Sequence, residues 1–451
     1  MGIWGRIAAA VLLATASSLF SVVASAAPGS VRAAPVPVGV GADPDVVAMP
    51  DGGALYVWIG SEGTPYHYVY SVRARRYAAN GTAGPELIIA DNLGPTIQPR
   101  VAADNAGNFV VTWAQSTTPG QGHRIFLRRC AAGGQPLSPI TAVDPDNAAI
   151  EQLGPSIAMN GQGRFAISWS TLSGSTSGRF FALQQGPIYM RRYGSDGTPL
   201  APTQKVSDRQ SGMIEVPIDP GIAVPVGIAA AVDIRYAATP PAISIDGSGS
   251  TIVAWTAGFK VTPQLVKIGG AFVTGLGLQQ VYAQRFDSAG DAAGKRALIE
   301  AGLVGWQEGY SSPAIAFTAD GGYVVAYARH DLLRLAAKRR GLYLKRVDAT
   351  GRVPIVAVEV MRDMPGDDAP DIAVAPNGTL AIALQQRTNA LSSGANAAVR
   401  LYTADGVALS AATMFKNDVI SDVHVAALTN GDFAMTWQPY DPIQAARVAG
   451  F

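Results

Sequence analysis

The sequence predicts an all-β fold, a seven-bladed β-propeller of four-stranded antiparallel blades. A frame recurs seven times: a Gly, an apolar run and, six residues after the Gly, a large apolar residue that is aromatic in six copies. Insertions aside, the copies lie about 50 to 60 residues apart, a period typical of propellers and solenoids. The frames run from Gly52 to Trp58, Gly107 to Trp113, Gly163 to Trp169, Gly249 to Trp255, Gly321 to Tyr327, Gly378 to Leu384 and Gly431 to Trp437.

Each copy divides into four short strands, a to d. In six copies a Pro stands eight residues before the frame Gly and is expected to open strand a, because Pro at a strand's first position costs no ladder bond. An Asp or Asn before the Gly, as in Asp51-Gly52 and Asn377-Gly378, predicts a tight a–b hairpin. The prolines are Pro44, Pro99, Pro155, Pro241, Pro313 and Pro370, and Val423 takes the place in blade seven.

Strand c ends in a basic residue followed by an apolar or aromatic one, as in Arg76-Tyr77 and Arg285-Phe286. A Gly five residues after the Arg predicts the turn into strand d. The last copy ends after strand c, and the segment 35–40 precedes the first strand a. We therefore expect the N-terminal segment to complete blade seven and close the ring, which removes exposed sheet edges; an open solenoid is the alternative.

The first 26 residues predict a cleaved signal peptide. Arg6 supplies the positive region, residues 8–23 the apolar region, and Ala24-Ser25-Ala26 the cleavage pattern. An uncleaved membrane anchor is the alternative. We expect a short linker over 27–34, a single propeller domain over 35–451 with no membrane span, and a secreted or periplasmic location.

Composition narrows the function classes. The net charge of +1 argues against a nucleic-acid partner. A single Cys, Cys130, excludes an internal disulfide framework and a thiolate metal cluster, and we expect it to be a buried small hydrophobe. No metal or other cofactor is expected, and the default oligomeric state is a monomer.

The amino-acid sequence of the repeats resembles the Gly-Gly-Phe-Val-Val-Thr-Trp … Ile-Tyr-Ala-Gln-Arg-Phe-Asp-x-x-Gly repeats of large secreted bacterial proteins, including haemolysin-type ones. Residues 281–290 carry the closest match. The resemblance implies a propeller and no single activity, and the calcium-binding nonapeptides of that class are absent. Frame Trp and Arg residues are accordingly expected to pack and to hydrogen-bond between blades.

Long insertions fall in b–c and d–a connections, which share one face of a propeller, called the top. Two apolar insertions, 209–239 and 257–280, flank blade four and are expected to form a small β cap; an exposed surface for a partner or membrane is the alternative. A third loop, 329–340, has a short helical pattern with the basic residues Arg334, Lys338, Arg339 and Arg340. It is expected to be solvated, with an anion or anionic-glycan contact as the alternative.

Catalytic and metal motifs are absent: the sequence has no nucleophile elbow, metalloprotease helix motif or phosphate loop. Residues 244–249 superficially resemble a sialidase Asp box, but a hairpin turn is the better interpretation. His67, His123 and His330 are expected on the top face without metal spacing, hence as surface histidines.

The candidate ligand site lies seven residues before each frame Gly, near the top of the innermost strand. The alternative is that small polar residues line the channel at random and bind no ligand. The polar residues at this position form an arc of neighbouring blades. If this arc is a site, Asp371, His424 and Asp45 supply acid–base or hydrogen-bonding groups and Arg100 supplies an anion clamp. Round the ring the residues are Asp45, Arg100, Ser156, Ala242, Ala314, Asp371 and His424.

Two function classes follow. The first is a non-catalytic binding or scaffold propeller that contacts a glycan, peptide or protein partner through the top face, motivated by variable top loops and missing catalytic motifs. The alternative is a propeller hydrolase or lyase that acts on an extracellular polymer through the Asp–His–Arg arc. Paired carboxylates beside a cleft favour the enzyme, and a smooth apolar top face favours the binder.

Overall fold

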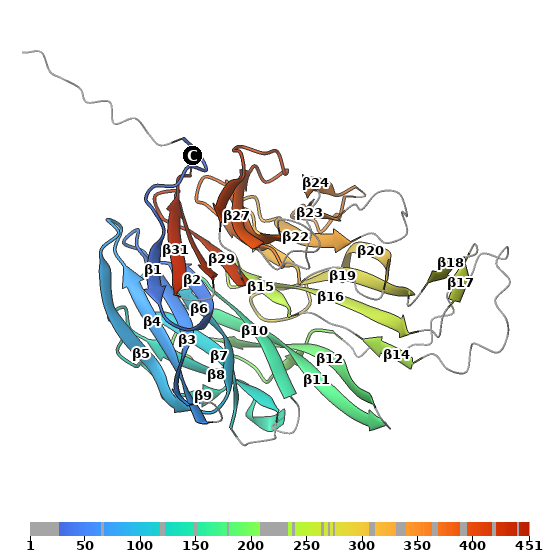
Figure 1. Ribbon diagram of the computed structural model, residues 1–451, viewed down its shortest axis with the longest axis horizontal. Coiled ribbons are helices and arrows are strands. Elements are labelled where there is room, and N and C mark those ends of the chain that lie inside the picture. Colours follow the sequence, from blue (N-terminus) through green and yellow to red (C-terminus); the bar gives the residue numbers. More distant parts are fainter. Residues whose placement is uncertain are drawn as a thin grey trace, which may run out of the picture.

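Seven sheets of antiparallel strands stand around a central axis in the computed structural model (Figure 1). The structure describes residues 27–450 without 65–66, 118–121, 148–150, 178–179, 208–232, 237–239, 263–265, 269–270, 274–275, 306–311, 331–339, 355, 363–368, 388–394, 417–420 and 440–441. The expected signal peptide, 1–26, lies outside the described residues. In the described part, the only helical element is a 3₁₀ turn, η1 (Pro145–Asn147).

The strands follow the order a, b, c, d in every blade. Blades one and two comprise β2 (Ala42–Ala48), β3 (Ala54–Thr64), β4 (His67–Tyr77), β5 (Ala83–Leu93), β6 (Thr96–Ala103), β7 (Phe109–Ser116), β8 (His123–Cys130) and β9 (Thr141–Ala142). Blades three and four comprise β10 (Glu151–Met159), β11 (Phe165–Ser177), β12 (Phe180–Tyr193), β13 (Gln204–Lys205), β15 (Ala242–Ile245), β16 (Thr251–Thr262), β19 (Leu276–Phe286) and β20 (Ala297–Gly305).

The remaining blades keep this order. Blades five and six comprise β21 (Ala314–Phe317), β22 (Tyr323–His330), β23 (Arg340–Val347), β24 (Val358–Arg362), β25 (Asp371–Val374), β26 (Leu380–Arg387), β27 (Ala395–Tyr402) and β28 (Thr413–Lys416). Blade seven comprises β29 (Ser421–Ala427), β30 (Phe433–Gln438), β31 (Ile443–Val448) and, from the other end of the chain, β1 (Val36–Gly39).

The ring closes as predicted. β1 pairs antiparallel with β31, with Val36 opposite Ala445, so one N-terminal and three C-terminal strands form blade seven (Figure 1). The segment before β1 continues this contact, because Val31 bridges Val448 and the Gly29 amide donates to the Ala449 carbonyl at 2.7 Å. The strands a of neighbouring blades contact each other all the way round. The seven-bladed propeller predicted from the repeat frame is confirmed.

The core lies between blades and is built from the repeat frame. All seven frame glycines adopt left-handed φ angles, between 81° and 90°, in the a–b turns, a conformation that Gly adopts without steric cost. The large residue at the end of each frame is buried, and Cys130 is also buried, as expected. The frame residues are Trp58, Trp113, Trp169, Trp255, Tyr327, Leu384 and Trp437.

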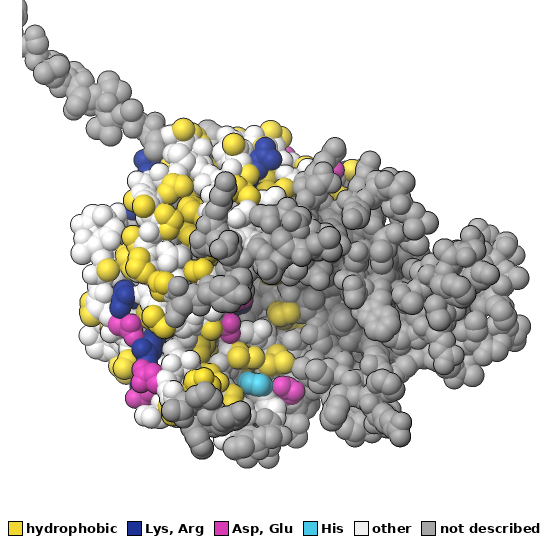
Figure 2. Space-filling model, viewed as in Figure 1, with side chains coloured by type: hydrophobic (Ala, Val, Ile, Leu, Met, Phe, Trp, Pro, Cys, Tyr) yellow, Lys and Arg dark blue, Asp and Glu magenta, His cyan; other side chains and the backbone are white. Residues whose placement is uncertain are grey.

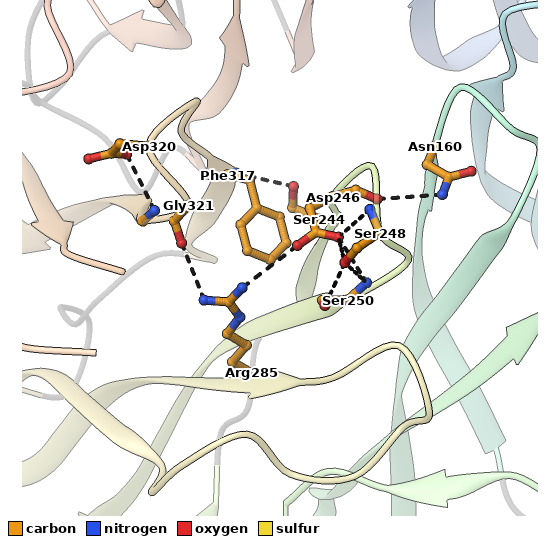
Figure 3. Close-up of polar contacts among 10 residues, drawn as sticks. Asn160, Ser244, Asp246, Ser248, Ser250, Arg285, Phe317, Asp320 and Gly321 are labelled. Atoms are coloured by element: carbon orange, nitrogen blue, oxygen red, sulfur yellow. Dashed lines mark hydrogen bonds and ion pairs between the residues drawn. The ribbon is translucent and has the colours of Figure 1, made fainter. Parts of the chain in front are cut away.

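The frame arginines connect neighbouring blades, as the repeat predicts. Arg76 donates to the Ala132 carbonyl in the next blade at 3.3 Å, and Arg447 donates across the closure to Ala79. Arg285 reaches from blade four to the Gly321 carbonyl of blade five, at 3.2 Å, and also faces Asp246 (Figure 3). In blade six, Arg400 is one residue out of frame and bonds Ser410 of its own blade.

A second cation one residue earlier points the other way. Arg128 donates to the Ile89 carbonyl and Arg191 to the Val143 carbonyl, each on the outer side of the preceding blade. Lys345 does the same to Ile299 at 2.6 Å. Since these cations donate to both neighbouring blades, they hold the blade-to-blade spacing rather than a ligand.

The expectation that Pro opens strand a is corrected in three blades. Strands β15, β21 and β25 begin directly after their Pro, but β2, β6 and β10 begin two to four residues before it. The added residues pair with strand b beyond a β-bulge that contains the Pro. A bulge tolerates Pro because the bulged residue needs no ladder hydrogen bond.

The two blade-four insertions pair with each other where the structure describes them. β14 (Asp233–Tyr236), from the first, pairs antiparallel with residues 259–262 of β16, from the second. β17 (Val266–Ile268) and β18 (Ala271–Val273) form a separate hairpin. Strand pairing between the insertions fits the expected β cap; most of 209–239, much of 257–280 and the basic stretch of 329–340 lie outside the described residues.

Charged and apolar side chains are mixed on the visible part of the surface. Figure 2 shows Lys or Arg alternating with Asp or Glu along the left edge of one face. In blade one, Glu86 pairs with Arg73 at 3.0 Å and with Arg75 at 3.1 Å. Within the described residues, no helix is long and apolar enough to cross a membrane.

Candidate functional site

The seven residues that stand seven positions before the frame Gly all line one central cavity. The cavity has a volume of about 490 Å³, within the range of about 300–1,000 Å³ that ligand sites occupy. Four of the five polar residues come from the consecutive blades seven, one, two and three, and blade six adds Asp371. The full set is Asp45, Arg100, Ser156, Ala242, Ala314, Asp371 and His424.

Asp45 and Asp371 make the same two contacts in different blades. The Asp45 carboxylate accepts the amide of Val46 at 2.8 Å and, from blade two, the amide of Val101 at 2.9 Å. Asp371 accepts the amides of Ile372 at 2.9 Å and, from blade seven, Val425 at 2.8 Å. Each carboxylate thus joins the inner strands of two blades, which fixes its position before any ligand is considered.

His424 lies between these two carboxylates. Its Nδ1 is 3.3 Å from Oδ2 of Asp371 and 3.7 Å from Oδ1 of Asp45, and its side chain is 17% exposed. The structure therefore brings together three residues of the candidate set, His424, Asp371 and Asp45. Because Nδ1 is held by the carboxylates, Nε2 is the ring nitrogen left for a ligand in the cavity.

The charges around His424 favour its protonated form. Burial and the Arg100 charge lower the pKa of His424, but the hydrogen bond to Asp371 and the negative charges of Asp45 and Asp371 outweigh them. The net effect is a pKa above the usual value. The shift makes this imidazole a better candidate for a proton donor than a histidine with the usual pKa.

Arg100 and Ser156 complete the predicted set. Both line the cavity and are half-buried. Arg100 donates to the carbonyl of Pro99 at 2.8 Å, and the structure records no carboxylate within ion-pair distance of it among the described residues. Its guanidinium therefore keeps donors available for a ligand oxygen.

A second group at the mouth, nine residues before the frame Gly, was not predicted. Asp43, Gln98 and Asp422 occupy this place in blades one, two and seven, and Gln98 and Asp422 line the cavity. All three have left-handed φ angles, of 52°, 55° and 50°, which are uncommon for residues other than Gly. A polar residue directly before the Pro position, in blades one and two, was the available sequence signal.

The other candidates named from the sequence do not line the cavity where the structure describes their side chains. The segment 244–249 is a hairpin turn, as predicted, in which Asp246 accepts the amides of Ser248 and Ser250, both at 2.9 Å (Figure 3). His123 faces Glu151 at 3.2 Å on the neighbouring blade. The side chains of His67 and His330 lie outside the described residues. Where the structure describes the chain, no three His, Cys, Asp or Glu side chains stand at metal-binding distances.

A second cavity, of about 410 Å³, lies at the closure between blades seven and one. It exists because Ala54 occupies the frame position where other blades have a bulky side chain such as Phe109. Its charged residue Asp432 is already paired with Arg32 at 2.9 Å and with Arg447 at 3.0 Å. The central channel is therefore the better candidate for chemistry.

Comparison with known proteins identifies the fold. The structure of polysaccharide lyase Uly1 has a TM-score of 0.52 and 9% sequence identity, covering 91% of this chain and 90% of that one. An α-L-arabinanase of Penicillium chrysogenum has a TM-score of 0.43 and 9% identity over 92% and 97%. A puromycin-hydrolyzing peptidase of Mycobacterium tuberculosis has 0.46 and 10% over 94% and 55%. No family model and no curated protein matches the sequence.

The expectation of a non-catalytic binding or scaffold propeller is corrected by these findings. The solved structure with a TM-score of 0.52, which matches 91% of this chain, is described as a polysaccharide lyase. The cavity also holds the groups that the non-catalytic interpretation lacked, a histidine fixed by two carboxylates beside an arginine. Both findings favour the alternative, an enzyme that acts on a polymer.

Proposed function

We propose that this protein is an exported enzyme that cleaves a polysaccharide at the mouth of its central channel. The observation that carries the proposal is His424, which lines the cavity while Asp371 and Asp45 hold its Nδ1. In such an arrangement the carboxylates fix the ring and raise the pKa of the imidazole, and Nε2 transfers the proton.

The other residues of the arc take supporting roles. Arg100 donates hydrogen bonds to sugar hydroxyl or carboxylate oxygens, and Ser156 adds a neutral polar contact from the next blade. Asp371 is a positioning residue that acts through His424. The wall from blades four and five, with Ala242 and Ala314, has no polar side chain at this strand position.

Fold and sequence support the substrate class. A structure with the same fold is described as a polysaccharide lyase, so a channel of this architecture accommodates polysaccharide chemistry in at least one other protein. The expected signal peptide and the resemblance to repeats of secreted bacterial proteins support a substrate outside the cytoplasm. We include the loops of the top face in this proposal, because loops around the channel mouth would extend the binding site along a polymer.

The test is to incubate the protein with a panel of neutral and uronate-containing polysaccharides and to measure cleavage by the release of reducing ends. The wild-type protein is expected to cleave at least one member. His424→Gln should lower kcat by about 100-fold or more, because it removes the proton-transfer group and keeps a similar shape. A panel with no cleaved member, or an unchanged rate in His424→Gln, contradicts the proposal.

A matched control comes from the same strand position in blade five. Ala314 lines the cavity but carries no polar group. Ala314→Ser should leave the rate within about twofold of the wild type, since it adds no charge to the channel. Because Ala314 is only 4% exposed, the free energy of unfolding of this variant is measured beside its rate. A similar loss in both variants would indicate a general effect on the channel rather than proton transfer at His424.

A further inference from the structure

Four consecutive blades share a left-handed backbone conformation at the channel mouth, which is strained for the three residues that are not Gly. Directly before the Pro position, Asp422, Asp43, Gln98 and Gly154 have φ angles of 50°, 52°, 55° and 59°. Each lies in a bulge at the start of strand a, in blades seven, one, two and three. Strained residues persist only where the surrounding structure holds them, and they cluster at functional sites.

At three of the four positions, a hydrogen bond from the preceding blade holds the left-handed backbone. Gln438 of blade seven accepts the Asp43 amide at 2.9 Å, and Asp43 accepts the Gln98 amide at 2.8 Å. Gln98 in turn accepts the Gly154 amide at 2.9 Å. This chain of bonds joins four blades and uses the side chains of both Asp43 and Gln98.

Asp422 differs from Asp43 in what its carboxylate contacts. It has the same backbone conformation and lines the cavity, yet the structure records no hydrogen bond or ion pair for its carboxylate among the described residues. Its charge acts across the blade boundary: after burial, Asp422 is the main cause of the raised pKa of Asp43. The left-handed residue Asp422 thus places an unpaired carboxylate at the mouth of the channel, within the described residues.

The carboxylate stands beside the proton donor. Asp422 is two residues from His424 on β29, and both side chains line the same cavity. Asp45 and Asp371 are already engaged by backbone amides and by His424. Of the four acidic residues discussed at the mouth, Asp422 is the one whose carboxylate is free to act on a substrate, judged within the described part of the chain.

We propose that Asp422 is the catalytic carboxylate that acts together with His424 and that the reaction is hydrolysis of a glycosidic bond. This inference rests on the proposed function and names its chemistry. Asp422 accepts a proton from water as the water oxygen bonds to the anomeric carbon, and the glycosidic oxygen leaves with the proton of His424 Nε2. Proton exchange with solvent then restores both groups, so the net change is the addition of one water.

The charge of the site favours hydrolysis over elimination. Elimination at a uronate needs an unprotonated base to remove a carbon-bound proton. The two carboxylates that hold His424 favour its charged form, which serves as an acid instead. The remaining base, the Asp422 carboxylate, is a weaker base than a neutral imidazole. Three carboxylates in the cavity against one Arg and one His also disfavour a polyanionic substrate, so a neutral polysaccharide is the expected class.

The first experiment identifies the reaction from the products of the wild-type protein. Hydrolysis gives product masses that sum to the substrate plus one water, without the ultraviolet absorbance of an unsaturated uronate. Cleavage that yields the unsaturated product refutes hydrolysis and leaves the proposed function standing. Absence of any cleavage refutes the proposed function itself, so the two failures are distinguishable.

The second experiment tests the residue. Asp422→Asn keeps the shape and tolerates the left-handed backbone, and it should lower kcat by about 100-fold or more with little change in KM. Asp422→Gly, which relieves the strain, should be equally inactive and regain activity with added formate. Ala369→Ser, the same position in blade six, is the control with unchanged activity. Full activity of Asp422→Asn, or no rescue of a folded Asp422→Gly, overturns the assignment.

Discussion

Blades seven, one, two and three differ from blades four, five and six at the top of the inner strand. In the first group strand a has seven to nine residues and contains a bulge; in the second, β15, β21 and β25 have four residues each. The cavity residues differ in parallel: His424, Asp45, Arg100 and Ser156 against Ala242, Ala314 and Asp371. The same repeat frame therefore supports two kinds of channel wall.

The difference shows how a repeat protein acquires a local site. The frame residues and arginines pack all seven blades alike, so they cannot distinguish one sector of the channel from another. A bulge re-aims the residues beside it without disturbing the ladder below. Extending strand a through a bulge in four adjacent blades thus places polar groups at the mouth while the blade cores stay unchanged.

After His424 itself, the largest effect in the comparison is expected where the two groups of blades meet, at Asp371. Asp371→Asn removes the charge that orients His424 and should lower kcat by about tenfold or more. The wild-type rate should fall as pH rises through the raised pKa of His424, because an acid must be protonated. In Asp371→Asn this fall should occur at lower pH. A pH–rate profile measures both, and an unshifted profile contradicts the positioning role.

A smaller effect is expected at Arg100, on the polar side of the channel. Arg100→Ala should raise KM by about tenfold and change kcat less, because a charge-assisted hydrogen bond contributes about 1.5–3 kcal/mol. Arg100→Lys should recover part of the loss. Initial rates over a range of substrate concentrations distinguish the two constants. A loss confined to kcat would place Arg100 at the reacting atoms instead.

The boundary between blades three and four provides a test of stability. Gly154 is left-handed, and a Cβ added to it would lie 2.7 Å from the Cβ of Pro240. Gly154→Ala should therefore lower the free energy of unfolding by about 1–3 kcal/mol. Gly81→Ala is the control: its φ is also left-handed, but no atom lies within 4 Å of the added Cβ. Equal losses in denaturant titrations would mean that the contact with Pro240 contributes nothing.

The smallest expected effect is the pH dependence of stability. The pKa of His424 is raised in the folded protein, so its contribution to stability is complete below the unfolded value of 6.5 and is lost as pH rises through the folded pKa. Denaturant titrations at acid and alkaline pH should show this decline. His424→Gln should flatten it, and an identical decline in the variant would assign the effect to another group.

Much of this architecture could be predicted because its determinants are local and repeated. The frame Gly, the Pro and the strand-c Arg recur in the sequence, and each fixes a turn, a strand or a blade-to-blade hydrogen bond. Closure by residues 36–39 was also predictable, since the last copy lacks a fourth strand. The position of Asp45 and His424 in the channel followed from the strand register alone.

What the sequence could not show depends on geometry across blades. The bulges arise at residues before the Pro position, where the copies share no repeated sequence beyond a polar residue in some blades, and a polar residue alone does not predict a left-handed angle. The contact of His424 with two carboxylates requires the curvature that brings blades six, seven and one together. The choice of a non-catalytic function failed for the same reason, because catalytic motifs are contiguous and this site is spread over separate strands.

A scan of the seven channel positions tests the central claim most directly. Each polar residue of the set is replaced by Ala and each Ala by Ser, and kcat/KM and thermal stability are measured for all seven variants on one cleaved polysaccharide. The account predicts the largest loss at His424, clear losses at Asp371, Asp45 and Arg100, and none at Ala242 or Ala314. A uniform profile round the ring, or losses at Ala242 and Ala314 equal to that at His424, would contradict it.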